Sequence, residues 1–429
     1  MVFVLSTDRV PLDPCHEARA RELLSKGRAA VWRTFPFTIM LKDRIRTESD
    51  VHDHRLKIDP GSKTTGIVIV QEATHSTSSG QADRVVFAAE LTHRGQAIRD
   101  SLLARRAVRR SRRQRKTRYR PARFLNRRRR AGWLAPSLAH RALTTDTWVR
   151  RLRAACPITA ISMELVRFDT QAMEHPEIAG VEYQRGTLFG WEVWNYLLAK
   201  WGHRCAYCGA TGVRLEQEHL IPRSRGGSDR ITNLTIACRP CNERKGNQTA
   251  AEFGFPHLMA LSKAPLKDAA AVNSVRWAIY QRLLATGLPV EAGTGGRTKW
   301  NRARLGWPKA HWRDAAVVGA STPDELHVAV GSVLLIASTG HGSRQMCGTN
   351  KHGFPIRHKR KQKRWFGFLT GDLVRAVIPR GKYAGTHIGR IAVRSRPLFK
   401  LSGFDVHPKY LRVIQRADGY AYTMREERS

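Results

Sequence analysis

Two closely spaced cysteine pairs constrain this chain more than any other feature. Two residues separate Cys205 from Cys208, and two residues separate Cys238 from Cys241. A two-residue spacer lets both sulfurs of a pair face one ion, and four thiolates from two tight turns suit tetrahedral zinc. A redox dithiol would need only one pair. We therefore expect this segment to fold around structural zinc, whose four cysteine ligands leave no open position for a catalytic water.

The chain as a whole carries a large excess of basic residues. Its 429 residues include 75 Lys or Arg and 35 Asp or Glu, which gives a formal net charge of +40. A compact protein with this charge repels itself and is stabilised by a polyanion, for which nucleic acid is the default partner. The sequence has no apolar run of about 18 residues that would span a bilayer, and residues 1–12 lack the pattern of a secretory signal. We therefore expect a cytoplasmic protein with no membrane partner.

Basic charge is concentrated in residues 102–130, which hold 15 Lys or Arg and no acid. The apolar residues of this segment are too sparse to form a buried stripe, so a helix here would be held by contact with a polyanion. The alternative is a disordered basic tail, although the segment lies between core-like sequences. The expected nucleic-acid contacts are Arg105, Arg106, Arg109, Arg110, Arg112, Arg113, Arg115, Lys116 and Arg118.

Two further segments offer basic residues to nucleic acid. The glycine-rich segment 293–299 is not a phosphate loop, because Lys299 follows Thr298 and Trp300 stands where Ser or Thr is required. We expect residues 293–296 to form a flexible loop that presents Arg297 and Lys299 to a nucleic-acid backbone. A second basic cluster, in residues 351–364, includes Lys359, Arg360 and Lys361, and its alternative is a basic linker or tail.

The order of the predicted elements indicates an α/β protein with several domains. Residues 11–14, Pro-Leu-Asp-Pro, are expected to form a rigid turn. We expect strands at 37–41, 55–59, 66–70, 85–91, 158–165 and 327–336, with the second to fourth forming an antiparallel meander. We expect helices at 16–26, 133–155, 188–201, 266–285 and 312–320. Short strand patterns broken by Gly and Pro predict small β-barrel-like modules in residues 341–429.

The polar residues around the cysteine pairs resemble the HNH nuclease motif in its ββα-metal setting. The matching residues are Glu218, His219, Asn233 and Asn242. The resemblance implies that a neutral His219 imidazole takes a proton from water near neutral pH, and that Asn233 bonds backbone and holds the His219 loop. Glu218, where the family commonly has Asp, and Asn242 would offer oxygens to Mg²⁺. The alternative is a zinc-stapled binding knuckle with an incidental histidine.

A second set of polar residues is scattered along the chain. Asp59 and Glu164 each end an expected strand, and His311 and Asp314 share a face at the start of an expected helix. An acid at a strand end is usually only a surface residue, but in this order the set resembles the split active site of RuvC-like nucleases of the RNase H fold. The resemblance implies that Asp59, Glu164 and Asp314 crowd around Mg²⁺ ions that clamp the attacking and departing oxygens. His311 would move a proton or touch phosphate.

The whole layout resembles the IscB family, which comprises transposon-encoded RNA-guided DNA endonucleases with an HNH domain inserted in a RuvC-like domain. Residues 11–14 are similar to the family's Pro-Leu-Met-Pro element, with Asp13 in place of Met. The arginine-rich residues 102–130 resemble its bridge helix. Residues 367–372 and 381–385 resemble the region that binds the guide RNA and the target-adjacent motif.

The resemblance implies an RNase H-like (RuvC) core split in three segments, an inserted zinc-containing HNH domain and small β-rich C-terminal modules. The expected boundaries are an N-terminal Pro-Leu-Met-Pro-like domain at 1–52, RuvC segments at 53–100, 132–190 and 256–340, a bridge helix at 101–131, an HNH domain at 191–255, and a region for guide RNA and target-adjacent motif at 341–429.

The resemblance also implies an activity. The chain would be a monomeric protein in a ribonucleoprotein, Mg²⁺-dependent at both sites and associated with the nucleoid when bound to DNA. In double-stranded target DNA, HNH would cut the guide-paired strand through His219, and the RuvC-like site would cut the displaced strand, while base pairing reads the sequence. Two alternatives stay open: an unguided HNH or resolvase-like nuclease, and a zinc-stapled RNA-binding protein without cleavage.

Overall fold

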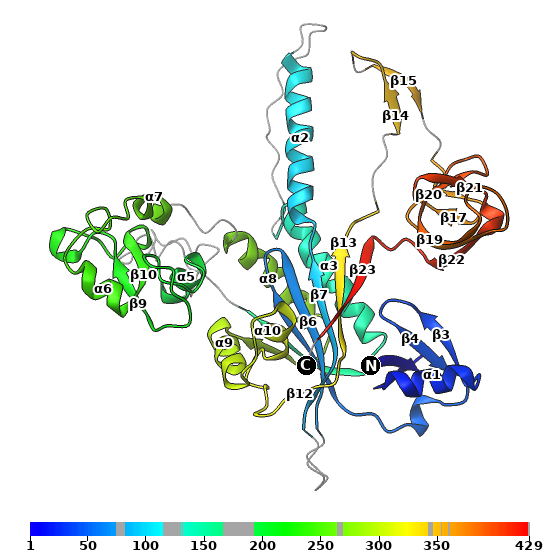
Figure 1. Ribbon diagram of the computed structural model, residues 1–429, viewed down its shortest axis with the longest axis horizontal. Helices are drawn as coiled ribbons and strands as arrows, with labels where there is room; N and C mark the ends of the chain where they lie inside the picture. Colours follow the sequence, from blue (N-terminus) through cyan, green and yellow to red (C-terminus); the bar gives the residue numbers. More distant parts are fainter. Residues whose placement is uncertain are drawn as a thin grey trace.

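The computed structural model describes residues 1–73, 82–114, 130, 132–165, 193–263, 269–341, 346–352, 354–358 and 361–427. The chain begins with a small unit built on a four-stranded sheet of order β2-β1-β4-β3 (Figure 1). Its elements are β1 Val2–Leu5, β2 Pro11–Cys15, α1 Glu17–Ser25, β3 Ala29–Arg33 and β4 Thr38–Leu41. Residues 11–14 are thus not the expected turn. They form an edge strand, where proline is tolerated because one side of the strand has no ladder to complete.

A larger mixed sheet forms the centre of the molecule, with the order β11-β8-β5-β6-β7-β13-β23 and β12 paired to β7 (Figure 1). Its strands are β5 His54–Pro60, β6 Thr64–Gln71, β7 Arg84–Thr92, β8 Ile158–Glu164, β11 Val290–Gly293, β12 His327–Val328, β13 Ser332–Ser338 and β23 Tyr420–Glu426. β5, β6 and β7 run antiparallel, which confirms the expected meander. β8 runs parallel to β5, and β11 parallel to β8.

Alternate residues of the central strands face opposite helical layers. Leu56 and Ile58 of β5 point into a core shared with α3 Pro136–Arg153 and α8 Ala269–Leu284. Val68 and Val70 of β6 point to the other face, where they pack against α10 His311–Ala316. The polar Asp59 sits one residue after Ile58, so strand alternation places it on the α10 face.

Near α10, three of the elements expected from the sequence differ from those in the structure. Residues 293–296 are not a flexible loop: β11 ends at Gly293, and Thr294 caps helix α9 Gly295–Arg304 by accepting a hydrogen bond from the Arg297 amide. α10 ends at Ala316 rather than 320, and the Asn301 side chain of α9 donates to the carbonyls of Val317 and Gly319 just beyond it. The strand expected at 327–336 is divided into β12 and β13.

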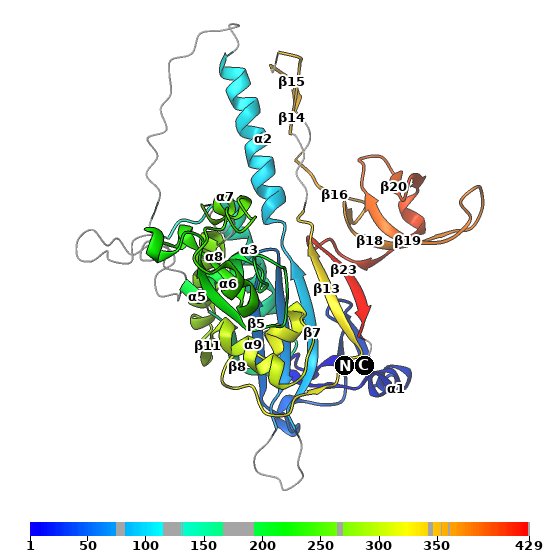
Figure 2. The ribbon, with the colours of Figure 1, turned by 60° about the vertical axis from the view of Figure 1, so that its left-hand side comes forward.

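Peripheral units extend from the central sheet, and helix α2 Gly95–Gln114 projects from it as a long rod in both views (Figures 1 and 2). The unit around the cysteines contains α5 Val193–Lys200, β9 Leu215–His219, β10 Leu234–Cys238, α6 Arg239–Lys245 and α7 His257–Lys263.

Short 3₁₀ helices span Arg46–Glu48, Arg223–Arg225, Ile231–Asn233 and Pro408–Tyr410. In the described part of the chain, no helix is both long enough and apolar enough to cross a membrane.

The C-terminal region is built from strands, as expected. Two hairpins pair β14 Cys347–Thr349 with β15 Pro355–His358 and β16 Arg364–Trp365 with β17 Phe368–Leu369. A five-stranded sheet of order β21-β20-β19-β18-β22 follows, with its own apolar core around Phe399. Its strands are β18 Leu373–Ile378, β19 Gly385–Ala392, β20 Phe399–Leu401, β21 Phe404–Val406 and β22 Leu411–Gln415.

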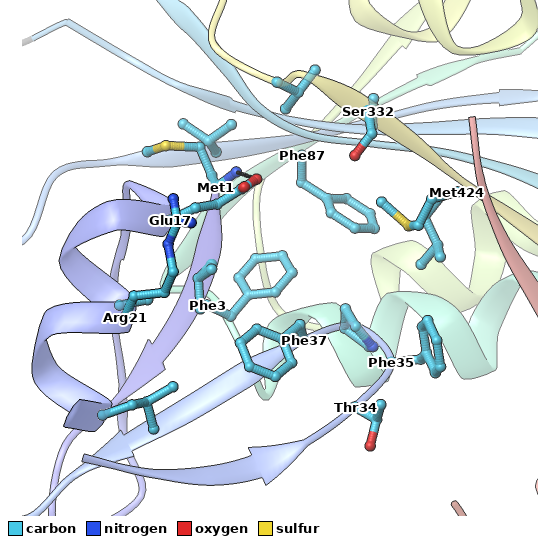
Figure 3. Close-up of a pocket in the computed structure, with 18 residues that line it drawn as sticks. Met1, Phe3, Glu17, Arg21, Thr34, Phe35, Phe37, Phe87, Ser332 and Met424 are labelled. Atoms are coloured by element: carbon cyan, nitrogen blue, oxygen red, sulfur yellow. Dashed lines mark hydrogen bonds and ion pairs between the residues drawn. The ribbon is translucent and has the colours of Figure 1, made fainter. Parts of the chain in front are cut away.

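An apolar cavity of about 580 Å³ lies between the N-terminal unit and the central sheet (Figure 3). Phe3, Phe35, Phe37, Phe87 and Met424 are among its lining residues. None of the polar residues singled out in the sequence lines it. The candidate chemistry therefore lies elsewhere, on the α10 face of the sheet and in the cysteine unit.

Candidate active sites

The four cysteines of the two pairs come together. Their sulfurs all lie within 4.8 Å of one another, and the Cys208 and Cys238 sulfurs are 3.7 Å apart. Zn–S bonds of about 2.3 Å at tetrahedral angles would place two sulfurs about 3.8 Å apart. Burial favours the neutral Cys205 thiol, but hydrogen bonds from backbone groups at residues 208, 238 and 207 outweigh it and lower the pKa of Cys205 to about 7. The cluster is therefore compatible with a bound zinc ion.

The cysteines close a strand–strand–helix unit. β9 and β10 pair antiparallel, with His219 opposite Leu234 and Leu215 opposite Cys238. Cys238 ends β10, and Cys241 lies in the first turn of α6, which packs on both strands. The connection between the strands, residues 220–233, starts directly after His219, so its conformation decides how that imidazole is presented.

Hydrogen bonds fix His219 and the loop that follows it. The Nε2 atom of His219 lies 2.7 Å from Oδ1 of Asp229. Arg223 donates to both oxygens of Asp229, at 2.8 and 2.7 Å, and the bonds from His219 and Arg223 lower the pKa of that carboxyl. The Asn233 side chain accepts from the Ile221 amide at 2.9 Å and donates to the carbonyls of Ile221 and Ser228. These are the backbone contacts expected of Asn233.

The expected metal-ligand pair, Glu218 and Asn242, is arranged differently from the expectation. The buried Lys245 ammonium donates to Glu218 at 2.6 Å, whereas the Asn242 amide donates to Glu216 at 3.1 Å. Glu216 and Glu218 are two residues apart on β9 and so share the face next to α6, while alternation turns His219 to the opposite face. Glu216 was missed by the sequence reasoning, although its two-residue spacing from Glu218 could have pointed to it.

Three acids from distant parts of the sequence gather on the α10 face of the central sheet. Asp59 lies near the end of β5, and Glu164 ends the adjacent parallel strand β8. Asp314 comes from α10, which packs across β5 and β6. Their side chains are only 14%, 11% and 12% exposed.

A glycine allows this helix to approach so closely. Gly66 lies opposite Asp59 in the β5–β6 ladder. A Cβ atom at Gly66 would lie 2.0 Å from the backbone oxygen of His311. No Cβ atom can approach a backbone oxygen that closely, so any side chain at this position would displace the helix. His311 itself is exposed at the first position of α10, three residues before Asp314. The lack of a side chain at residue 66 therefore brings Asp314 down to the acids of the sheet.

The acids influence one another strongly. Burial, and next the negative charge of Glu164, raises the pKa of Asp59 well above its usual range; Asp314 adds to this, while Arg276 and Lys309 oppose it. Arg276, from α8, donates to Glu164 at 2.8 Å and to the Pro60 carbonyl at 3.0 Å, and lies 3.8 Å from Asp59.

A second arginine, Arg302 of α9, forms an ion pair with Asp314. Two guanidinium groups thus offset the repulsion in this site. Over the residues that the structure describes, only the cysteines form a group of three or more potential metal ligands within 4.8 Å, so the acids interact without converging that closely. Arg276 and Arg302 had no distinguishing signal in a chain with 75 basic residues.

The expected nucleic-acid contacts lie mainly on exposed helices. Arg105, Arg106, Arg109, Arg110 and Arg113 are exposed on α2, which also contains Arg112. Lys299 is exposed on α9, and Lys361 is exposed before β16. Arg115, Lys116, Arg118, Lys359 and Arg360 lie outside the described residues.

Two family models match separate parts of the chain. Residues 2–186 match the family model described as RRXRR protein, and residues 205–258 match the model described as HNH endonuclease. No curated protein matches the chain.

Among solved structures, Streptococcus thermophilus Cas9 in complex with the AGAA PAM is 11% identical, with 60% of this chain and 32% of that chain covered and a TM-score of 0.22. Streptococcus thermophilus Cas9 in complex with the GGAA PAM is 12% identical, with 60% of this chain and 32% of that chain covered and a TM-score of 0.21. The Type II-C Cas9 enzyme from Actinomyces naeslundii is 17% identical, with 42% of this chain and 29% of that chain covered and a TM-score of 0.14. The chain spans about a third of the length of these Cas9 chains. As the sequence resemblance predicted, the chain contains an HNH endonuclease domain, which lies in residues 205–258.

Proposed function

We propose that this chain is an RNA-guided, Mg²⁺-dependent DNA endonuclease that cuts the two strands of its target at two separate sites. The observation that carries the proposal is the joint presence of an HNH endonuclease domain and of three buried acids gathered on a mixed sheet. The HNH domain would cut the guide-paired strand, and the acid site would cut the displaced strand.

A RuvC-like reading of the acid site is supported by the sheet topology. Three antiparallel strands followed by two parallel ones, in the order β7-β6-β5-β8-β11, are the arrangement expected of an RNase H-like core. The core would be contributed by residues 53–100, 132–190 and 256–340. Asp59, Glu164 and Asp314 would hold Mg²⁺, which stabilises the charge that builds up on the reacting phosphate. His311 lies at the exposed start of α10, where it can reach a phosphate or a proton.

In the HNH domain, the hydrogen bond to Asp229 selects the tautomer of His219. When Nε2 carries the proton and donates it to Asp229, Nδ1 is the acceptor that can take a proton from an attacking water. Asn233 holds the loop in place. The carboxylates of Glu216 and Glu218, with the Asn242 amide, would supply oxygen ligands for a hard cation such as Mg²⁺ on the α6 face of β9, which is opposite to the face of His219.

The remaining parts fit the same proposal. Structural zinc at the four cysteines would hold the turn at residues 205–208, the end of β10 and the start of α6 together. The exposed arginines of α2 would grip guide-RNA phosphates as a bridge helix, and the C-terminal β modules would contact the guide RNA and a motif beside the target. The net charge of +40 favours such polyanionic partners, because they offset the self-repulsion of the chain.

Strand-resolved cleavage tests this proposal. The ribonucleoprotein is purified, its RNA is sequenced, and a matching DNA duplex is labelled separately on each strand. We expect His219→Ala to leave only the displaced strand cut and Asp59→Ala to leave only the guide-paired strand cut. Either variant that still cuts both strands would refute the site assignment. If RNA-free protein cuts as well as the loaded protein, the chain is an unguided nuclease; if the loaded wild type cuts neither strand, it is an RNA-binding protein.

A further inference from the structure

Helix α9 presents an exposed tryptophan between two arginines. Trp300 is 56% exposed, and the guanidinium carbons of Arg297 and Arg304 lie 5.7 and 5.0 Å from its ring centroid. Trp312, on the next helix, is completely buried. An aromatic face in water beside cations is the arrangement with which proteins stack the bases of single-stranded nucleic acid.

The opposite face of α9 is fixed to the core. Thr298 and Asn301 are buried, and the Asn301 amide donates to the carbonyls of Val317 and Gly319, both at 2.9 Å. Arg304 is tied by an ion pair to Asp324 and by a 2.7 Å hydrogen bond to the Pro323 carbonyl. The outer face, which also carries Lys299, is therefore a rigid platform, and α9 contains no acid that would repel phosphate.

The same helix touches two of the three acids. A Cβ atom at Gly295 would lie 3.4 Å from the Glu164 carboxylate, and Arg302 forms an ion pair with Asp314. Trp300 lies five residues after Gly295, which is about 7.5 Å along the helix axis. Five residues also turn Trp300 about 140° around the helix from Gly295, so the path between the acids and the ring is longer than this axial rise and spans several nucleotides of a single strand. A strand whose phosphate reaches the acids would have to curve around α9 to place a base on its outer face.

We propose that Trp300 stacks on a base of the displaced DNA strand a few nucleotides from the bond that is cut, while Arg297 and Lys299 hold its phosphates. The inference rests on the proposed function and names how the acid site takes its substrate. Bases in a duplex keep their faces covered, whereas a displaced strand exposes them. The platform therefore selects single-stranded DNA for the acid site.

Strand-resolved rates test the platform in the ribonucleoprotein loaded with guide RNA. Loss of one stacked base is expected to slow cutting of the displaced strand about fivefold or more in Trp300→Ala, while cutting of the guide-paired strand is unchanged. Trp300→Phe, which keeps a ring, is expected to stay within about twofold of wild type. Trp32→Ala is the matched control, because Trp32 is 45% exposed beside Arg9 but lies on β3 in the N-terminal unit. Equal rates for Trp300→Ala and wild type would overturn the inference.

Fluorescence supplies a readout that does not depend on cleavage. 2-Aminopurine, whose emission is quenched by stacking, is placed at successive positions of the displaced strand and bound to the Asp59→Ala ribonucleoprotein. We expect one position to be quenched, and its emission to return in the Trp300→Ala double variant but not with Trp32→Ala. Quenching only of a probe in the guide RNA would mean that α9 binds RNA, which contradicts the inference. If Asp59→Ala itself still cuts the displaced strand, the proposed function fails instead.

Discussion

At the scale of single residues, Arg276 holds the candidate acid site together. Its guanidinium group is buried, contacts the Glu164 carboxylate and the Pro60 carbonyl, and lowers the pKa of Asp59 against the effects of burial and of Glu164. Carboxylates crowded for metal binding repel one another whenever no cation lies between them. The arginine supplies a permanent positive charge that lets the strands β5 and β8 bring their acids together.

Replacing Arg276 by Gln should therefore destabilise the protein in a way that depends on divalent ions. Removing one partner of a buried ion pair costs about 3–5 kcal/mol, and Mg²⁺ bound to the uncovered acids should restore part of this stability. The measurement is the unfolding free energy of the ribonucleoprotein in EDTA and in Mg²⁺. Arg151→Gln is the control, since Arg151 pairs with Asp418 at 3.0 Å away from the acids. An equal loss for Arg276→Gln with and without Mg²⁺ would show that the arginine has no link to a metal site.

The candidate residues could be found from the sequence to different degrees. Asp59, Glu164 and Asp314 lie near element ends, which is a weak signal for each residue alone, and they were singled out because their order resembles a RuvC-like active site. Arg276 had no such signal, because it lies in mid-helix and contacts acids that are over a hundred residues away in the sequence. The pairing of Asn242 with Glu216 instead of Glu218 depends on how α6 rotates against β9, which spacing alone does not define.

At the scale of elements, the position of α10 depends on the absence of a side chain at Gly66. The helix lies directly on β6, and Asp314 reaches the acids only because the His311 backbone meets no Cβ atom there. Strand patterns predicted β5 to β8 correctly, since alternation reports burial on two faces. The close contact between helix and strand was not predictable, because a glycine in a strand has several possible causes.

Gly66→Ala should push α10 away from the sheet and separate Asp314 from Asp59. We expect a loss of about 1–3 kcal/mol of stability from overpacking and at least about a tenfold fall in displaced-strand cutting, as expected for a misplacement of about 1 Å. Cutting of the guide-paired strand should not change. The comparison is with Gly296→Ala in α9, where a Cβ atom would meet nothing within 4 Å. If both alanine variants cut the displaced strand at the wild-type rate, the packing of α10 does not control the site.

Two elements show why local patterns failed. β2 contains two prolines, which usually indicate a turn, but an edge strand accepts them. The glycine-rich residues 293–296 were expected to be flexible, yet a threonine cap and the anchoring of Asn301 make them the end of a strand and the start of a helix. In both places the tertiary surroundings determine the structure, and a single sequence does not contain that information in its local pattern.

At the scale of the whole molecule, the net charge of +40 should dominate binding to nucleic acid. A protein that neutralises about six to ten phosphates loses about 10³- to 10⁵-fold in affinity between 50 and 200 mM salt. We expect guide-RNA affinity, measured by filter binding over this range, to fall steeply. Changing Arg105, Arg109 and Arg113 of α2 to Gln should flatten the logarithmic slope by about 0.7 for each lost phosphate contact. If the guide-RNA affinity of the wild type does not change with salt concentration, binding does not depend on contacts between basic side chains and phosphates.

The last strand of the chain has a consequence for how such proteins can be rebuilt. β23 returns to the central sheet and pairs with β13, and the amides of Thr339 and Gly340 bond the carbonyl of Gly419 at 2.9 and 2.8 Å. Everything between these residues leaves and re-enters at a single point, as a cassette between two neighbouring strands. Modules of very different size could therefore be grafted there, or trimmed to a short turn, while the central sheet stays complete.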